Sequence, residues 1–203
     1  MCGQMNIVDD ATLQELMEEL GVDDYPAPSQ PQAPLFKPSQ STLMLSQDQG
    51  QLSASHAQWG IHPSWSKQLL INARSETISE KPSFQAAFQQ NRVLIPCQGW
   101  YEWKAGSTSS NKDKFLIEPT THQALLMAAV FYPEQNQFVT LTCQANNALK
   151  TVHHRMPVVI NKRDAKHWLS ADPTSAESLF LSEQQNSYKI LPIAPAAQNL
   201  SLF

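Results

Sequence analysis

Short apolar runs of strand length recur through the second half of the chain, and they limit the possible folds more than any other feature. Apolar and aromatic residues become denser after Trp59, and turn residues separate the runs. The predicted strands are Arg92–Pro96, Gly99–Trp103, Phe115–Glu118, Leu125–Phe131, Phe138–Cys143 and Val158–Ile160. Isolated helical segments interrupt these strands without regular alternation. The pattern therefore predicts an α+β fold and not a doubly wound sheet.

Helices and loops are predicted between and before these strands. A helix over residues 12–20 is expected because Thr12 and Glu15 form a capping-box pattern and Gly21 can end the last turn. Further helices are predicted from Pro82 and over residues 145–152, 163–169 and 175–181. Strands are predicted at 3–8 and Thr42–Ser46, with loops at the proline-rich segment 22–40, at 47–58 and at 105–113.

Length and composition point to one ordinary domain. The chain has 203 residues, 41% of them hydrophobic and 16% charged, which is enough apolar material for a single core. We see no internal linker and therefore predict one domain over residues 1–203. The net charge of −4 disfavours a broad basic face for duplex DNA. Binding to nucleic acid would require a local basic groove.

Membrane, secretion and metal signals are weak throughout the sequence. No apolar run reaches the roughly 18 residues of a membrane span, and the first 20 residues carry acids without Lys or Arg. Cys2, Cys97 and Cys143 are too widely spaced for a disulfide framework or a zinc site, and the last two resemble core residues. We expect a cytoplasmic protein that uses no metal and no cofactor.

Cys2 is the first candidate for chemistry. Removal of Met1 would leave a free α-amine and a thiol on one residue, and these groups ordinarily titrate near ~8 and ~8.5. Such an aminothiol condenses with an aldehyde to a Schiff base, which the thiol then closes to a five-membered thiazolidine. The alternative is that Cys2 is an ordinary residue of a frayed terminus.

Two polar motifs interrupt the apolar runs. Asn72 offers a hydrogen-bond donor and an acceptor, and Arg74 offers a planar fork for phosphate, although a turn stabilised by Asn72 is the alternative. Glu102 lies between aromatic residues, where desolvation would raise the pKa of its carboxyl and suit it to acid–base catalysis. Alternation places Trp100 and Glu102 on one strand face. The alternative is that Glu102 faces solvent.

A third polar motif contains His153 and Arg155. Imidazole is the natural proton shuttle near pH 7, and Arg155 could contact an anion. The alternative is that His153 and His154 are polar surface or satisfied core residues. No Cys-x-x-Cys or His-Glu-x-x-His pattern lies nearby, so a metal site is not predicted.

Taken in order, these motifs resemble the SOS response-associated peptidase (SRAP) family, whose members crosslink to abasic sites in single-stranded DNA. The matching segments are Met1–Gly3, Trp59–Trp65, Ile71–Thr77, Gly99–Lys104 and His153–Pro157. The resemblance extends to about Leu169, and the segment 182–203 diverges. It implies a single α+β domain with a curved mixed β-sheet or barrel-like core and flanking short helices.

The resemblance also implies roles for individual residues. Cys2 would be the nucleophile and crosslinking residue, and Asn72 would orient the amine and the opened sugar. Glu102 would shuttle protons, and His153 would act as acid and base in ring opening and crosslink reversal. The implied DNA contacts are Arg74, Arg155, Trp65, Pro38 and Thr142. The implied partner is single-stranded DNA containing abasic sites, bound by a monomer at damaged DNA in the nucleoid.

Two departures from the family pattern affect the DNA contacts. Gln4 stands where the family often has Arg, and the loop 33–38 lacks the usual Arg and Asn, so the phosphate contacts are expected to be fewer. Removal of its own Met1 and a β-elimination lyase activity are further expectations from the family. Two other functions stay open: a thiol peptidase with Cys2 as nucleophile and His153 as base, and a non-catalytic single-strand binder.

Overall fold

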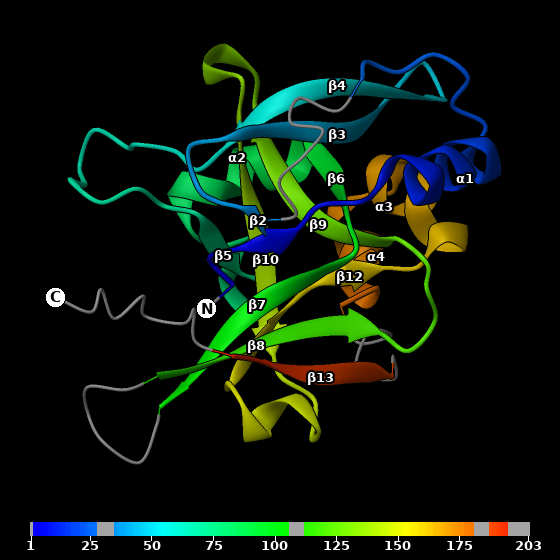
Figure 1. Ribbon diagram of the computed structural model, residues 1–203. Helices are drawn as coiled ribbons and strands as arrows, with labels where there is room; N and C mark the ends of the chain where they lie inside the picture. Colours follow the sequence, from blue (N-terminus) through cyan, green and yellow to red (C-terminus); the bar gives the residue numbers. More distant parts are fainter. Residues whose placement is uncertain (1, 28–34, 106–111, 181–186, 195–203) are drawn as a thin grey trace, which may run out of the picture.

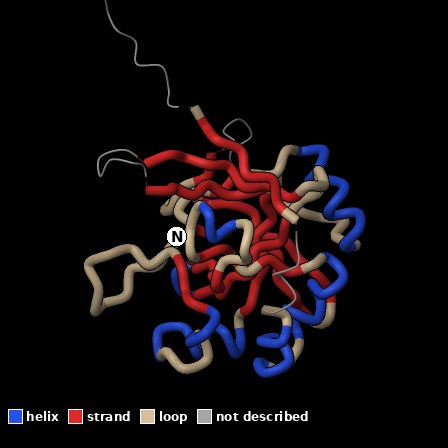
Figure 2. The backbone as a smooth tube through the Cα atoms, turned by 90° about the horizontal axis from the view of Figure 1, so that it is seen from below, coloured by secondary structure: helices blue, strands red, loops and turns tan. Residues whose placement is uncertain are grey.

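The computed structural model describes residues 2–27, 35–105, 112–180 and 187–194 (Figure 1). Strands fill the middle of the molecule and the helices lie around its periphery (Figure 2). The strands form two sheets of mixed and antiparallel pairing. This arrangement confirms the predicted α+β class.

The smaller sheet carries the start of the chain. Its strands pair antiparallel throughout, and the short β1 lies between β2 and β7. In spatial order they are β13 (Tyr188–Ile193), β8 (Lys112–Pro119), β7 (Gly99–Ala105), β1 (Met5–Asn6) and β2 (Leu35–Phe36). Residues immediately before β1 are therefore held beside β7.

The larger sheet closes on itself. β10 pairs parallel with β4 and antiparallel with β9, and β3 and β6 complete the ring. The strands in order are β11 (Arg155–Pro157), β10 (Gln137–Gln144), β4 (Gln51–Trp59), β3 (Ser41–Asp48), β6 (Arg92–Cys97), β9 (Leu125–Tyr132) and β12 (Val159–Ile160). β5 (Asn72–Arg74) pairs parallel with β10. The closure and the mixed pairing confirm the predicted barrel-like core.

A stack of aromatic rings joins the two sheets. Trp59 is fully buried, and its ring lies between Phe36 of the smaller sheet and Phe138 of β10, at centroid distances of 5.8 and 6.4 Å. The indole N–H of Trp59 donates to the Ile71 carbonyl at 2.9 Å, so this buried polar group is satisfied. The bond also fixes the chain just before β5.

Short helices cover the outside of the sheets. They are α1 (Asp10–Leu20), α2 (Pro82–Gln90), α3 (Ala165–Ser170) and α4 (Pro173–Ser178), with 3-10 turns at Ser75–Thr77, Pro133–Gln135, Leu149–Thr151 and Lys162–Asp164. None of the helices among the described residues is long and apolar enough to cross a membrane. Buried Arg92 donates to the carbonyls of Phe88 and Trp168 at 2.7 Å each, which ties β6 to α2 and α3.

Several predicted boundaries are wrong for local reasons. The first helix is capped by Asp9, whose carboxylate accepts from the Thr12 amide at 2.9 Å, so Thr12 is not the cap. The predicted loop 47–58 is mostly strand: β3 and β4 form a hairpin whose turn contains Gln49 and Gly50 at φ 47° and 83°. Polar residues alternate along β4, because its outer face is exposed.

Other segments differ in extent. The predicted strand 3–8 pairs only at Met5–Asn6, the proline-rich loop contains β2, and the segment 182–203 contains β13. The predicted helix 145–152 is reduced to one 3-10 turn. In the predicted loop 105–113, residues 106–111 lie outside the described part of the chain, and β8 already begins at Lys112.

Candidate active site

Cys2 is buried at the start of the smaller sheet. Cys2 is 1% exposed, and its Sγ lies 3.8 Å from the Gln4 carbonyl oxygen. Burial raises the pKa of the Cys2 thiol well above its usual value, and the negative charge of Glu102 raises it further. Burial shows that Cys2 is not part of a frayed terminus. The thiol is held protonated, in contrast to the partly ionised thiol expected from its ordinary pKa.

Asn72 connects Cys2 to the larger sheet. Its Nδ2 donates to the Cys2 carbonyl at 2.8 Å, across 70 positions of sequence. Its Oδ1 accepts from the Thr140 hydroxyl at 2.7 Å, which fixes the orientation of the amide. Sequence reasoning missed Thr140, because a threonine inside an apolar strand carries no signal of a polar partner. The side chain of Asn72 thus acts as a clamp on the Cys2 backbone.

Glu102 is buried on the inner face of β7. Trp100 and Glu102 are 0% and 1% exposed, while Trp103 on the other face is partly exposed. This confirms the predicted alternation and rules out a solvent-facing Glu102. Desolvation raises the pKa of the Glu102 carboxyl to about 7. At neutral pH the carboxyl can therefore both accept and donate a proton.

His153 lies between the 3-10 turn Leu149–Thr151 and β11. Its Nδ1 accepts from the Arg155 amide at 3.0 Å, and the same atom lies 3.2 Å from the Arg155 carbonyl oxygen. Burial lowers the pKa of His153. The lowered pKa favours the neutral form of the ring near pH 7.

Arg155 forms an ion pair and hydrogen bonds with other residues of the protein. Its side chain is 8% exposed, and its guanidinium donates to both carboxylate oxygens of Glu76, at 2.5 and 2.9 Å. It also donates to the carbonyl and the hydroxyl of Thr142. The Thr142 hydroxyl in turn donates to the Ala73 carbonyl at 3.2 Å. Arg155 and Thr142 therefore hold β5, β10 and β11 in register behind the site.

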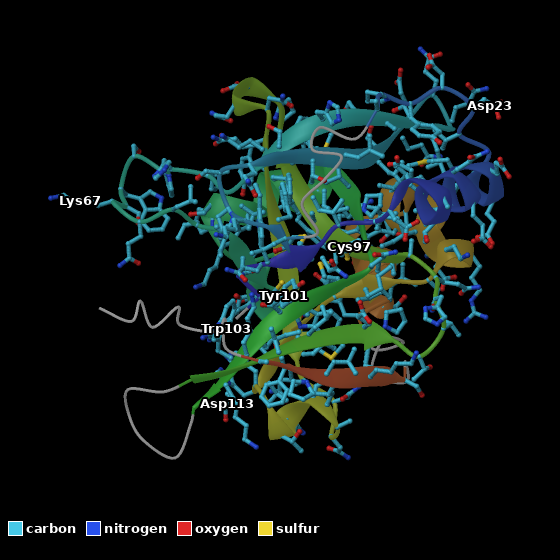
Figure 3. The ribbon with its side chains drawn as sticks, in the orientation of Figure 1. Asp23, Lys67, Cys97, Tyr101, Trp103 and Asp113 are labelled. Carbon is cyan, nitrogen blue, oxygen red and sulfur yellow. The ribbon has the colours of Figure 1, made fainter. Side chains whose placement is uncertain are left out.

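The other predicted DNA contacts lie at the surface. Arg74 is exposed at the end of β5, directly after the Asn72 clamp. Trp65 is 68% exposed, in the loop that also carries Lys67 far from the body of the protein (Figure 3). Beside Trp65 lies a cavity of about 170 Å³, lined in part by Ile61 and Tyr132. Pro38 is half-buried, two residues after the end of β2.

These placements bring three predicted catalytic residues to one place. Cys2, Asn72 and Glu102 meet where the start of the chain passes between β7 and β5, while His153 approaches from the end of β10. Figure 1 shows the N-terminus at this position, beside β5 and β7. Among the described residues no cluster of His, Cys, Asp and Glu could hold a metal ion. The site is a buried aminothiol precursor with a carboxyl of shifted pKa beside it.

Comparison with known proteins identifies the family. The family model described as SOS response associated peptidase (SRAP) matches residues 1–200. The chain belongs to the SRAP family. The match continues past Leu169, where the motif resemblance ended, and so includes β13 of the smaller sheet.

Several SRAP relatives carry names that describe a function. The abasic site processing protein YoqW of Bacillus subtilis is 27% identical over 221 residues, covering 99% of this chain and 97% of that protein. The abasic site processing protein YedK of Escherichia coli is 28% identical over 174 residues, covering 80% and 78%. A solved structure of a phage-related protein from Bordetella bronchiseptica has a TM-score of 0.76 at 23% identity, covering 96% and 95% of the two chains. That structure shares the fold.

Proposed function

We propose that this protein processes abasic sites in single-stranded DNA by forming a thiazolidine crosslink between Cys2 and the aldehyde of the opened sugar. The names of the SRAP relatives support the substrate class. One observation carries the chemistry: Cys2, next to the start of the chain, is buried against a carboxyl whose pKa is raised to about 7. Removal of Met1 by the protein itself would complete the aminothiol.

The first stage is opening of the sugar. An abasic sugar is mostly a closed hemiacetal, so a base must take the proton of the anomeric hydroxyl while an acid protonates the ring oxygen. Glu102 in its ionised form is the base. The acid is His153 in its imidazolium form, and because burial lowers the pKa of His153 this form gives up its proton readily.

The second stage joins the amine to the aldehyde. The unprotonated α-amine of Cys2 attacks the carbonyl carbon and gives a carbinolamine. Loss of water requires protonation of the leaving hydroxyl, and the protonated form of Glu102 supplies that proton. The Asn72 amide donates a hydrogen bond to the Cys2 carbonyl during this step, so the α-amine and the thiol of Cys2 stay oriented toward the sugar.

The third stage closes the ring. Sγ forms a bond to the imine carbon, the electron pair of the C=N bond moves to nitrogen, and the thiol proton passes through Glu102 to that nitrogen. Because burial keeps the thiol protonated until the Schiff base is present, the amine reacts first. The same Schiff base would allow β-elimination at the 3′ phosphate, which accounts for the expected lyase activity.

DNA would reach this site over the exposed residues. We propose Arg74 as a phosphate contact and Trp65 with Pro38 as the path of the strand. Arg155 and Thr142 support the site through Glu76 and Ala73, which favours a positioning role for both. Their direct contact with DNA, the monomeric state and action at damaged DNA in the nucleoid stay predictions.

The buried thiol argues against a thiol peptidase. Such an enzyme needs a thiolate, and both burial and the charge of Glu102 raise the pKa of Cys2. A non-catalytic single-strand binder would have no use for a buried carboxyl beside Cys2. Both alternatives predict that the protein forms no covalent product with an abasic oligonucleotide.

The experiment is incubation with a single-stranded oligonucleotide containing one abasic site, followed by a denaturing gel. We expect a heat-stable shifted band for the wild type and for the control Cys143→Ala, and no such band for Cys2→Ala. Cys143 is also a buried cysteine that forms no disulfide, so it is matched to Cys2 in chemistry. If the wild type gave no such band and instead cleaved a peptide library, the proposed function would be wrong and a peptidase would be indicated.

A further inference from the structure

A pair of lysines lies on the outer face of the smaller sheet, next to the candidate active site. Lys114 pairs with Trp103 across β7 and β8, so both side chains are on the face opposite Glu102. The Lys114 Nζ lies 4.1 Å from the ring centroid of Tyr101 and 5.4 Å from that of Trp103. Figure 3 shows both aromatic residues on β7. These rings hold the ammonium in a defined place.

Lys37 belongs to the same face. It follows β2, whose residue Phe36 pairs with Met5 of β1, and β1 pairs with β7. Burial lowers the pKa of Lys114, and the positive charge of Lys37 lowers it further. Lys37 is exposed.

Neither Lys37 nor Lys114 forms an ion pair in the part of the chain that the structure describes. The ion pairs found there join Arg155 to Glu76, Lys162 to Glu19 and Arg163 to Asp164. Two neighbouring cations repel each other, and an anion placed between them would relieve the repulsion. The chain as a whole has a net charge of −4, so such a local pair is what binding of a polyanion would require.

The residues next to Lys37 and Lys114 indicate which anion the two lysines would bind. Lys37 directly precedes Pro38, and Lys114 lies across from Trp103, the residue after Glu102. We propose that Lys37 and Lys114 bind the phosphate backbone of single-stranded DNA beside the lesion. This proposal rests on the proposed function. The partly exposed ring of Trp103 offers a surface for a base of the same strand.

The test uses undamaged single-stranded oligothymidylate, which has no aldehyde. Binding is measured by fluorescence anisotropy at several salt concentrations for the wild type, Lys37→Gln, Lys114→Gln and the control Lys166→Gln. Lys166 is an exposed lysine of α3. Each phosphate contact adds about 0.7 to the slope of log affinity against log salt. Losing one contact should therefore lower the slope by about 0.7 and the affinity about fivefold at roughly 0.1 M salt.

Additional variants separate charge from packing. Lys114→Arg keeps the charge over the aromatic rings and should bind as the wild type does, and Lys37→Gln leaves those rings untouched. Slopes for Lys37→Gln and Lys114→Gln equal to that of Lys166→Gln would overturn the proposal. Crosslinking of an abasic oligonucleotide by the wild type tests the proposed function separately. If that reaction fails while the lysine variants still lose affinity for undamaged DNA, the lysine pair stands and the crosslinking function falls.

Discussion

Glu102→Gln should make the protein more stable at high pH. In the folded protein the pKa of Glu102 is about 7, whereas an exposed glutamate titrates near 4.5. Between these values the folded state binds one proton more than the unfolded state. The free energy of unfolding therefore falls by about 1.4 kcal/mol for each pH unit as pH rises. Over the whole window of about 2.5 units the loss amounts to roughly 3 kcal/mol, present in full above pH 7.

Gln cannot ionise, so the variant avoids this loss. Wild type and Glu102→Gln are compared by urea denaturation at pH values from 4 to 8.5, and the difference in unfolding free energy is plotted against pH. The difference should be constant below about pH 4.5, move in favour of Gln up to pH 7 and then level off. Any constant offset reports only the packing of the amide. A difference that does not change with pH would refute a buried carboxyl of raised pKa.

Three further outcomes concern the chemistry and the DNA contacts. Cys2→Ala should lose the heat-stable crosslink while its amine still gives a Schiff base that borohydride traps; an undiminished stable crosslink would assign the bond to another residue. Glu102→Gln should slow crosslink formation by about 10²–10⁴-fold, while His153→Ala should slow formation at sugar opening and also leave a crosslink that resists reversal in a chase with a competing aldehyde trap; a His153→Ala crosslink that reverses as fast as that of the wild type would contradict the role of His153. Because Gln4 is uncharged and the loop 33–38 contains no Arg or Asn and only one basic residue, Lys37, the salt dependence of DNA binding should correspond to fewer than about six phosphate contacts at about 0.7 each, and a steeper slope would contradict that expectation.

The sequence predicted the class of fold because its strand signals are strong where strands are buried. Arg92–Cys97 and Leu125–Tyr132 are almost wholly apolar, and both form inner strands of the closed sheet. The sequence of β4 predicts a loop, because the exposed face of this strand is polar and its turn carries no Asn-Gly or Asp-Gly signal. The two-residue strands β1 and β2 were too short to show alternation.

The sequence predicts which residue types form the site, but not the hydrogen bonds and ion pairs between them. The alternation of Gly99–Ala105 correctly placed Glu102 inward, because period 2 is a local property. The bond from Asn72 to Cys2 spans the whole first third of the chain, and nothing local signals it. Arg155 is predicted as a DNA contact from its charge and from the family resemblance, whereas its ion pair with Glu76 depends on tertiary packing.

The central claim is that the α-amine and the thiol of Cys2 together capture an abasic aldehyde. The most direct test is intact mass spectrometry of the product formed with an abasic oligonucleotide without borohydride, followed by proteolysis to locate the adduct. The account predicts a mass equal to the chain without Met1 plus the oligonucleotide less one water, with the sugar on Cys2 and the bond stable to heat. A crosslinked chain that retains Met1, or an adduct located on a lysine, Cys97 or Cys143, would contradict it.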